Sequence, residues 1–202
     1  MEKGLAIITG ADGGMGQVIT AALAKAGYPV IMACLDPEKA APVCTRIQQE
    51  TGNTQIEVRA IDLASLSSVN NFTGQLLKEG RPISRLMNNA GILTTPVRRT
   101  EDGLETIVSV NYMAPYMLTR QLLPLMQPGC RIVNTVSCTY AIGRIEPDFF
   151  EKGRNGRFFR IPVYSNTKLA LLLFTQELAE RLQDKDITIN ASDPGIVSTN
   201  MI

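Results

Sequence analysis

Short apolar runs alternate with longer segments of helical periodicity along the whole chain. The apolar runs predict six buried strands, at residues 5–8, 30–33, 56–61, 83–87, 131–136 and 187–191. Helical segments follow the strands, the first running to residue 26 and the others at 37–50, 65–79, 101–126 and 164–183. This alternation predicts an α/β fold in which one doubly wound parallel sheet lies between two layers of helices.

The alternation also predicts a single domain, residues 1–202. No linker, internal repeat or low-complexity tract interrupts it. The one irregular stretch, at about 138–163, is rich in Gly, Arg and Phe, and we expect it to form a long surface insert.

The composition excludes several kinds of chemistry. The chain has no histidine, so it can build neither a Ser-His-Asp or Cys-His triad nor an imidazole metal site. Its 4 cysteines form no CxxC pair, and we predict no metal. The net charge of +1 and the scattered basic residues predict no nucleic-acid or membrane partner. With no signal peptide and no apolar run long enough for a membrane span, we expect a cytoplasmic protein.

A glycine-rich turn, residues 9–16, lies between the first strand and the helix after it. Glycines at 10, 14 and 16 allow a tight turn and a close approach of the backbone to a pyrophosphate, which the free helix N–H groups would face. The spacing differs from the GxGxxG dinucleotide fingerprint. An ordinary strand–helix turn would also tolerate these glycines, so both interpretations stay open.

A second group of residues suggests proton transfer. Tyr164 and Lys168 are four residues apart at a predicted helix start and therefore share one face. A nearby ammonium lowers the pKa of a phenol, and such a pair can exchange a proton with a carbonyl or alcohol oxygen. The same spacing also arises by chance in chains of this composition. Ser137 ends the fifth predicted strand, where it would bind the reacting oxygen or only a local backbone group.

Asn111 lies four residues before Pro115 in the predicted 101–126 helix. Because proline has no N–H, the carbonyl of Asn111 loses its helical partner and becomes free to bind water. The alternative is a proline kink that has no chemical role.

Taken together and in this order, the motifs resemble those of the short-chain dehydrogenases/reductases. The glycine turn is similar to that family's TGxxxGxG. The further matches are Asp62-Leu63, Asn88-Asn89-Ala90-Gly91, Asn111, Ser137, Tyr164-Ser165-Asn166-Thr167-Lys168 and Pro194-Gly195. The stretches 33–39, 131–134 and 168–179, together with the insert before Tyr164, resemble the retinol dehydrogenase-like branch. The resemblance implies a Rossmann-type fold.

The resemblance further implies an NAD(P)-dependent oxidoreductase that interconverts a carbonyl and an alcohol on a small-molecule substrate by hydride transfer. It makes Tyr164 the proton donor or acceptor, Lys168 the residue that tunes it, Ser137 the residue that positions the oxygen, and Asn111 the anchor of a relay water. It assigns cofactor binding to Tyr164, Lys168 and the residues Gly10, Asp12, Gly13, Gly14, Met15, Gly16, Leu35, Asp62, Leu63, Asn89, Ala90, Gly91, Pro194, Gly195 and Val197. Without the resemblance, several of these would be turn or helix-cap residues.

Three positions depart from the family pattern. Leu35 and Gly13 stand where NADP-specific members place a basic residue, and Cys34 stands where NAD-specific members place an aspartate. Asp36 would oppose a 2′-phosphate and Lys39 would attract one. Because the expected phosphate partners are missing, the sequence favours NAD.

Two other functions stay open: a dinucleotide-binding sensor or scaffold without turnover, and a same-fold epimerase or dehydratase with bound NAD. Relatives continue beyond residue 202, so we expect that the C-terminal part of the fold is missing. The strongly apolar 164–183 helix suggests a homo-oligomer that forms through this helix.

Overall fold

The computed structural model describes residues 3–150 and 157–195. Within these residues, six parallel strands form one sheet in the order β3-β2-β1-β4-β5-β6. The strands are β1 (Leu5–Thr9), β2 (Val30–Cys34), β3 (Ile56–Ala60), β4 (Ile83–Asn88), β5 (Met126–Thr135) and β6 (Thr188–Ser192). The strand order reverses between β1 and β4, and ligands of such sheets bind beyond the carboxyl ends of the strands at this point.

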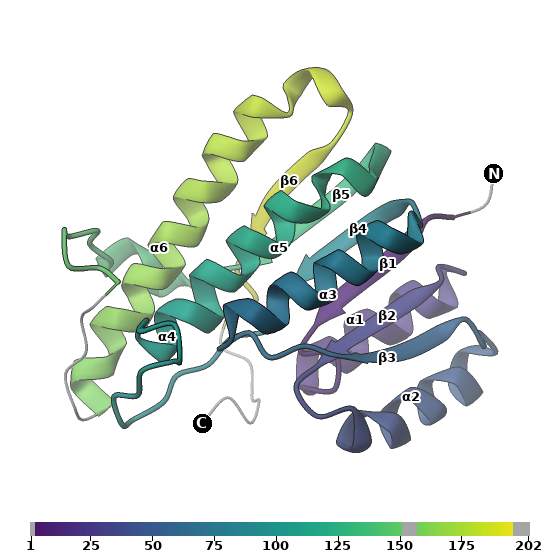
Figure 1. Ribbon diagram of the computed structural model, residues 1–202, viewed down its shortest axis with the longest axis horizontal. Helices are drawn as coiled ribbons and strands as arrows, with labels where there is room; N and C mark the ends of the chain where they lie inside the picture. The colour runs from purple at the N-terminus through teal and green to yellow at the C-terminus, as the bar shows by residue number, and fades with distance from the viewer. Residues whose placement is uncertain (1–2, 151–156, 196–202) are drawn as a thin grey trace.

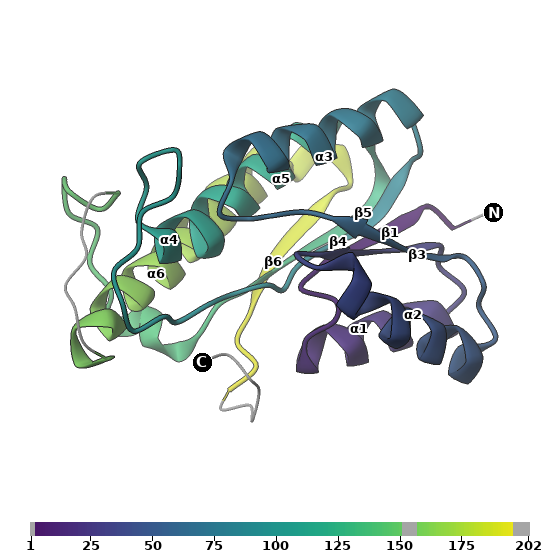
Figure 2. The same cartoon turned by 60° about the horizontal axis from the view of Figure 1, so that its bottom comes forward.

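Helices cover both faces of the sheet (Figures 1 and 2). One face carries α1 (Gly14–Lys25) and α2 (Pro37–Thr51), and the other carries α3 (Leu66–Glu79), α5 (Ala114–Leu122) and α6 (Arg157–Arg181). Side chains of a strand alternate between the faces, so Ile7 packs in the cluster under α3, α5 and α6 while Ile8 packs under α1 and α2. The predicted doubly wound, three-layer α/β fold is therefore confirmed.

Local capping explains where two of the helices begin and end. Asp36 caps α2: its Oδ1 accepts hydrogen bonds from the N–H groups of Glu38 (3.1 Å) and Lys39 (3.2 Å). The helix ends at Gly52, whose φ of 70° is the left-handed conformation that glycine adopts without strain. Ser65 caps α3 in the same way.

The expected helix at 101–126 is wrong in three respects. The helix begins only at α4 (Thr106–Val108), and it passes through a π-helical turn, η1 (Ser109–Met113), before α5. It ends in a 3-10 turn, η2 (Leu123–Leu125). β5 then begins at Met126 rather than at 131, because its first residue pairs with Ile83 across an irregularity in the β4–β5 register. Pro128 and Gly129 in this part of β5 hid the strand from the sequence pattern.

The expected insert at 138–163 is also partly wrong. It opens with a 3-10 turn, η3 (Cys138–Ile142), and its last residues belong to α6, which begins at Arg157. Tyr164 therefore lies inside α6 rather than at a helix start, and Pro162 within the helix explains the misplaced boundary. Phe149 of the insert is buried against Tyr112, so this stretch is not wholly on the surface. A last 3-10 turn, η4 (Gln183–Lys185), joins α6 to β6.

No helix in the described part of the chain is long and apolar enough to cross a membrane.

Candidate active site

The sequence-predicted residues gather at the carboxyl edge of the sheet, where the turns after β1 and β4 are bound to each other. The Thr9 hydroxyl accepts hydrogen bonds from the N–H groups of Asn89 (3.0 Å) and Ala90 (3.1 Å). The Asn89 side-chain amide donates to the Thr9 carbonyl at 3.0 Å. The Asn88–Gly91 segment is therefore a fixed neighbour of the glycine-rich turn.

The glycine-rich turn presents backbone rather than side chains. Gly10 has a φ of 61°, and a Cβ there would lie 3.2 Å from Ala90. A Cβ at Gly16 would lie 2.0 Å from the Gly10 carbonyl oxygen, so only glycine allows α1 to pack against the turn. Gly13 and Gly14 are exposed, no side chain caps the start of α1, and Met15 in its first turn is partly buried. Uncapped N–H groups at a helix start fit a phosphate group.

Asp12 lies beside the end of β2, a contact that sequence reasoning missed. Burial, and after it the charge of the nearby Asp12 carboxylate, raise the pKa of the Cys34 thiol to about 12. Leu35 is 71% exposed. The Asp36 carboxylate is engaged in the α2 cap and in an ion pair with Lys39 at 3.0 Å. The carboxylate next to the buried strand end is thus that of Asp12.

Asn111 lies in the π-helical turn, where the Ala114 N–H donates to the Ser109 carbonyl. Its side chain is buried and fully used: Oδ1 accepts from the Ile92 N–H at 2.8 Å, and Nδ2 donates to the Ile92 carbonyl at 2.9 Å. Nδ2 also lies 3.5 Å from the Thr167 hydroxyl. These contacts hold the turn in place, while the binding of a water by the Asn111 carbonyl stays a prediction. Turns of this kind often occur at functional sites.

The Tyr164 hydroxyl lies near the Ser137 hydroxyl, just beyond the end of β5. Burial raises the pKa of Tyr164, Ser137 acts to lower it, and Asp193 and Cys138 raise it further. Lys168 is not among these causes, so the expectation that it lowers the pKa of Tyr164 stays a prediction. Ser137 also accepts a hydrogen bond from the Thr139 N–H at 3.4 Å, so it serves the local backbone as well.

Lys168 is buried directly beneath Tyr164. Its ammonium donates to the Thr135 carbonyl at 2.7 Å and lies 5.4 Å from the centroid of the Tyr164 ring. Burial lowers the pKa of Lys168 to about 8. A Cβ at Gly91 would lie 3.5 Å from the Lys168 ammonium nitrogen and 3.6 Å from the Asn111 Oδ1, so the three residues meet in one place.

The remaining predicted residues lie at the same edge. Asp62 accepts a hydrogen bond from the Ala64 N–H at 2.8 Å and shapes the turn before α3, whose cap is Ser65. The Leu63 side chain is buried in the core. Pro194 and Gly195 are exposed after β6, and Val197 lies outside the described residues. Asp193, which the sequence left without a role, accepts a hydrogen bond from the Gly195 N–H at 2.9 Å.

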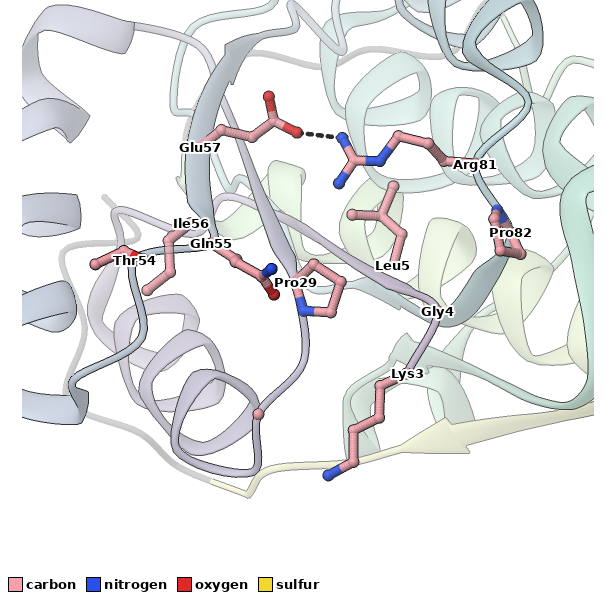
Figure 3. A pocket seen from close by; sticks show the side chains of 11 residues that line it. Lys3, Gly4, Leu5, Pro29, Thr54, Gln55, Ile56, Glu57, Arg81 and Pro82 are labelled. Atoms are coloured by element: carbon pink, nitrogen blue, oxygen red, sulfur yellow. Dashed lines mark hydrogen bonds and ion pairs between the residues drawn. The ribbon is translucent and has the colours of Figure 1, made fainter. Parts of the chain in front are cut away.

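A cavity of about 440 Å³ lies elsewhere, at the amino edge of the sheet. Figure 3 shows Glu57 and Arg81 paired across it, with Lys3 at its rim. None of the sequence-predicted residues lines this cavity, so it is separate from the candidate site. Among the described residues, no group of three or more His, Cys, Asp or Glu side chains could hold a metal ion.

The chain matches a known protein family along nearly its whole length. Residues 4–147 and 151–202 match the family model described as short chain dehydrogenase. The chain belongs to the short-chain dehydrogenase family. This short-chain dehydrogenase is 36% identical over 197 residues to human Retinol dehydrogenase 13, an alignment that covers 96% of this chain and 59% of that protein. It is 38% identical over 212 residues to human Retinol dehydrogenase 14, covering 96% and 62%. The chain thus spans about three fifths of the length of these curated relatives.

Solved structures agree with the fold. A crystal structure of an uncharacterised protein from Mycobacterium paratuberculosis superposes with a TM-score of 0.85 at 35% identity, covering 99% of this chain and 71% of the other. A short-chain dehydrogenase from Sphingobium yanoikuyae, solved in complex with NADPH, gives a TM-score of 0.78 at 23% identity and covers 98% and 73%. The likeness to retinol dehydrogenases confirms the branch that the sequence motifs suggested.

Proposed function

We propose that this short-chain dehydrogenase is an NAD(P)-dependent oxidoreductase that interconverts a carbonyl and an alcohol on a small-molecule substrate. One observation carries the proposal: the buried Tyr164 lies with its hydroxyl near that of Ser137 and with the Lys168 ammonium 5.4 Å from its ring centroid. Two hydroxyls that lie close together at the carboxyl edge of a parallel sheet can bind one substrate oxygen between them.

The residues present fit a nicotinamide dinucleotide, which supplies or accepts a hydride when bound. The backbone at Gly10, Asp12, Gly13, Gly14, Met15 and Gly16 would hold its pyrophosphate, since this turn offers uncapped N–H groups. Asn89, Ala90 and Gly91 would line the adenosine ribose, and Asp62 with the backbone of Leu63 would flank the adenine. Pro194, Gly195 and Val197 would adjoin the nicotinamide, and Lys168 its ribose.

The chain's own groups would handle the proton. Tyr164 would give its hydroxyl proton to the substrate oxygen in reduction and take it back in oxidation, while Ser137 donates a hydrogen bond to that oxygen. Lys168, with a pKa of about 8, is able to exchange protons near neutral pH. The main chain of Asn111 would anchor the water that links Lys168 to solvent.

We further propose that the protein prefers NAD to NADP. The carboxylate of Asp12 lies against Cys34 at the end of β2, where a 2′-phosphate would bring two further negative charges. Leu35 offers no positive charge there, and the Lys39 ammonium is already paired with Asp36 at 3.0 Å.

The cytoplasmic location and the homo-oligomer stay predictions. Core burial accounts for much of the apolar character of α6, since Leu171, Phe174 and Leu178 are all buried. Among the described side chains of α6, Leu173 is a large apolar one that is exposed, at 47%, and that a second copy would cover.

A spectrophotometric screen tests the proposed function. The full chain is mixed with NADH or NADPH and with decanal or 4-nitrobenzaldehyde, and loss of reduced cofactor is followed. Turnover supports the proposal. Cofactor binding without turnover of either aldehyde would instead favour the sensor or scaffold.

A further inference from the structure

The largest fully buried side chain outside the proton-transfer group is a charged one, Arg160 of α6. Its guanidinium forms an ion pair with Glu105, and the side chains of the two are 0% and 1% exposed. Removing two charges from water is costly, and the attraction between them compensates only when their remaining polar atoms are also matched. Arg160 Nη1 is buried without a hydrogen-bond partner among the described residues, so the other bonds of the pair determine what it holds together.

Each member of the pair is bonded to a different part of the backbone. Glu105 Oε2 accepts hydrogen bonds from the N–H groups of Ile107 (2.8 Å) and Val108 (3.2 Å), so this carboxylate caps the helix that runs into the π-helical turn. Arg160 Nε donates to the Thr94 carbonyl at 3.0 Å. The pair thus joins α6 both to the start of α4 and to the segment that follows β4.

These bonds converge on the two halves of the proton-transfer site. Arg160 lies four residues before Tyr164 on the same helix, so the two share a face. Ile107 and Val108, held by Glu105, pack in one buried cluster with Tyr164. Figures 1 and 2 both show α4 against the first turns of α6. The π-helical turn η1, which contains Asn111, follows directly on the segment that Glu105 caps.

We propose that Arg160 and Glu105 are positioning residues that hold the Tyr164 turn of α6 in register with the Asn111 turn. This inference rests on the proposed function for its effect on turnover, but the mechanical connection stands on the bonds alone. Reacting groups must be held close to their productive geometry, and a misplacement of about 1 Å can cost about 100-fold in rate. Loosening the pair should therefore lower kcat while leaving distant cofactor contacts unchanged.

Arg160→Lys is the mild test variant, because lysine keeps the positive charge but loses the planar fork that reaches both Glu105 and Thr94. Arg160→Met and Glu105→Gln break the pair outright. Arg181→Lys is the matched control: Arg181 lies on the same helix and pairs with Glu177 at 2.5 Å, but at the surface, with 65% exposure.

Each variant is compared with the unmodified full chain in three measurements. Hydrogen exchange by mass spectrometry reports the protection of residues 106–116, 160–168 and 37–51. NADH fluorescence gives the cofactor Kd, and decanal or 4-nitrobenzaldehyde reduction gives kcat and KM. We expect Arg160→Lys to lose protection in the first two segments together, to keep Kd and KM within about threefold and to lose at least about tenfold in kcat. Arg181→Lys should change none of these.

Other outcomes distinguish a failure of the positioning role from a failure of the proposed function. Unchanged kcat in Arg160→Lys, or equal loss of protection at 37–51, would reduce the pair to a general stabiliser and overturn the inference. If the unmodified protein shows no turnover with either aldehyde, the proposed function fails. Hydrogen exchange alone then tests whether the pair holds the Tyr164 turn and the Asn111 turn together. Protection lost in only one of the two site segments rejects this connection.

Discussion

The Lys168 ammonium lies 5.4 Å from the centroid of the Tyr164 ring and gives its hydrogen bond to the Thr135 carbonyl rather than to the phenol oxygen. The charge is therefore held against the face of the ring. This explains why burial dominates the pKa of Tyr164, which is raised, although a lysine stands four residues away. The two groups share a helix face, as the spacing predicts, but the ammonium contacts the ring of Tyr164 and not its hydroxyl oxygen.

Removing the phenol hydroxyl should separate turnover from binding. In Tyr164→Phe, the ring keeps its packing with Val108 and Val163 while the proton donor is lost. We expect kcat to fall by about 10²–10⁴-fold and the cofactor Kd to change little. Stopped assays with decanal and a fluorescence titration with NADH measure the two effects. Undiminished turnover would remove Tyr164 from the mechanism.

The buried lysine makes stability depend on pH. Burial lowers the pKa of Lys168 from 10.5 to about 8, so between these values the unfolded chain binds a proton that the native chain does not. Stability should therefore rise with pH above about 8, and the charged form costs on the order of 3 kcal/mol below it.

Denaturant unfolding at pH 7, 8 and 9 of the protein and of Lys168→Met measures this effect. The thiols of Cys34 and Cys130, whose pKa values are raised from 9.0 to about 12 and about 11, reduce stability only above pH 9. The comparison therefore does not go above pH 9. The difference between the two proteins should shrink as the pH rises, and a constant difference would contradict the buried charge.

The glycine-rich turn offers a matched pair of substitutions. A Cβ at Gly16 would lie 2.0 Å from the Gly10 carbonyl oxygen, whereas a Cβ at Gly74 in α3 meets nothing within 4 Å. Gly16→Ala should destabilise by roughly 2–3 kcal/mol through overpacking. Gly74→Ala should stabilise by about 0.5–1 kcal/mol, because alanine is the better helix residue.

Thermal and urea unfolding measure both variants, and NADH fluorescence shows whether Gly16→Ala also loses cofactor. Equal stability of the two alanine variants would mean that the turn accommodates a side chain, and that its glycines are not required by packing.

Cofactor choice should depend on the carboxylate beside Cys34. Asp12→Asn removes a negative charge and keeps the size of the side chain, so NADPH should bind several-fold more tightly while NADH changes less. Asp184→Asn serves as the control, since that carboxylate lies in η4, next to the opposite edge strand β6. Parallel titrations with both cofactors decide the matter. An unaltered NADPH-to-NADH ratio in Asp12→Asn would reject this role.

Part of the site follows from the sequence because it depends on local rules. Spacing alone puts Tyr164 and Lys168 on one helix face, and strand-end positions alone put Ser137 at the carboxyl edge. Asp36 and Pro37 fix the start of α2 through capping. The contact of Asp12 with Cys34 had no such signal, since the two residues meet only when β1 and β2 pair.

The alternation of apolar strands and helices by itself determined the doubly wound sheet, because burial on both faces requires that pattern of residues. Only the tertiary structure determined three features of the site region. The π-helical turn at Asn111, the early start of α6 and the Arg160–Glu105 pair each depend on partners far away in the chain, such as Ile92 and Thr94. Local propensity measures only neighbouring residues, whereas the energy of a buried charge or a strained turn depends on what the folded chain brings against it.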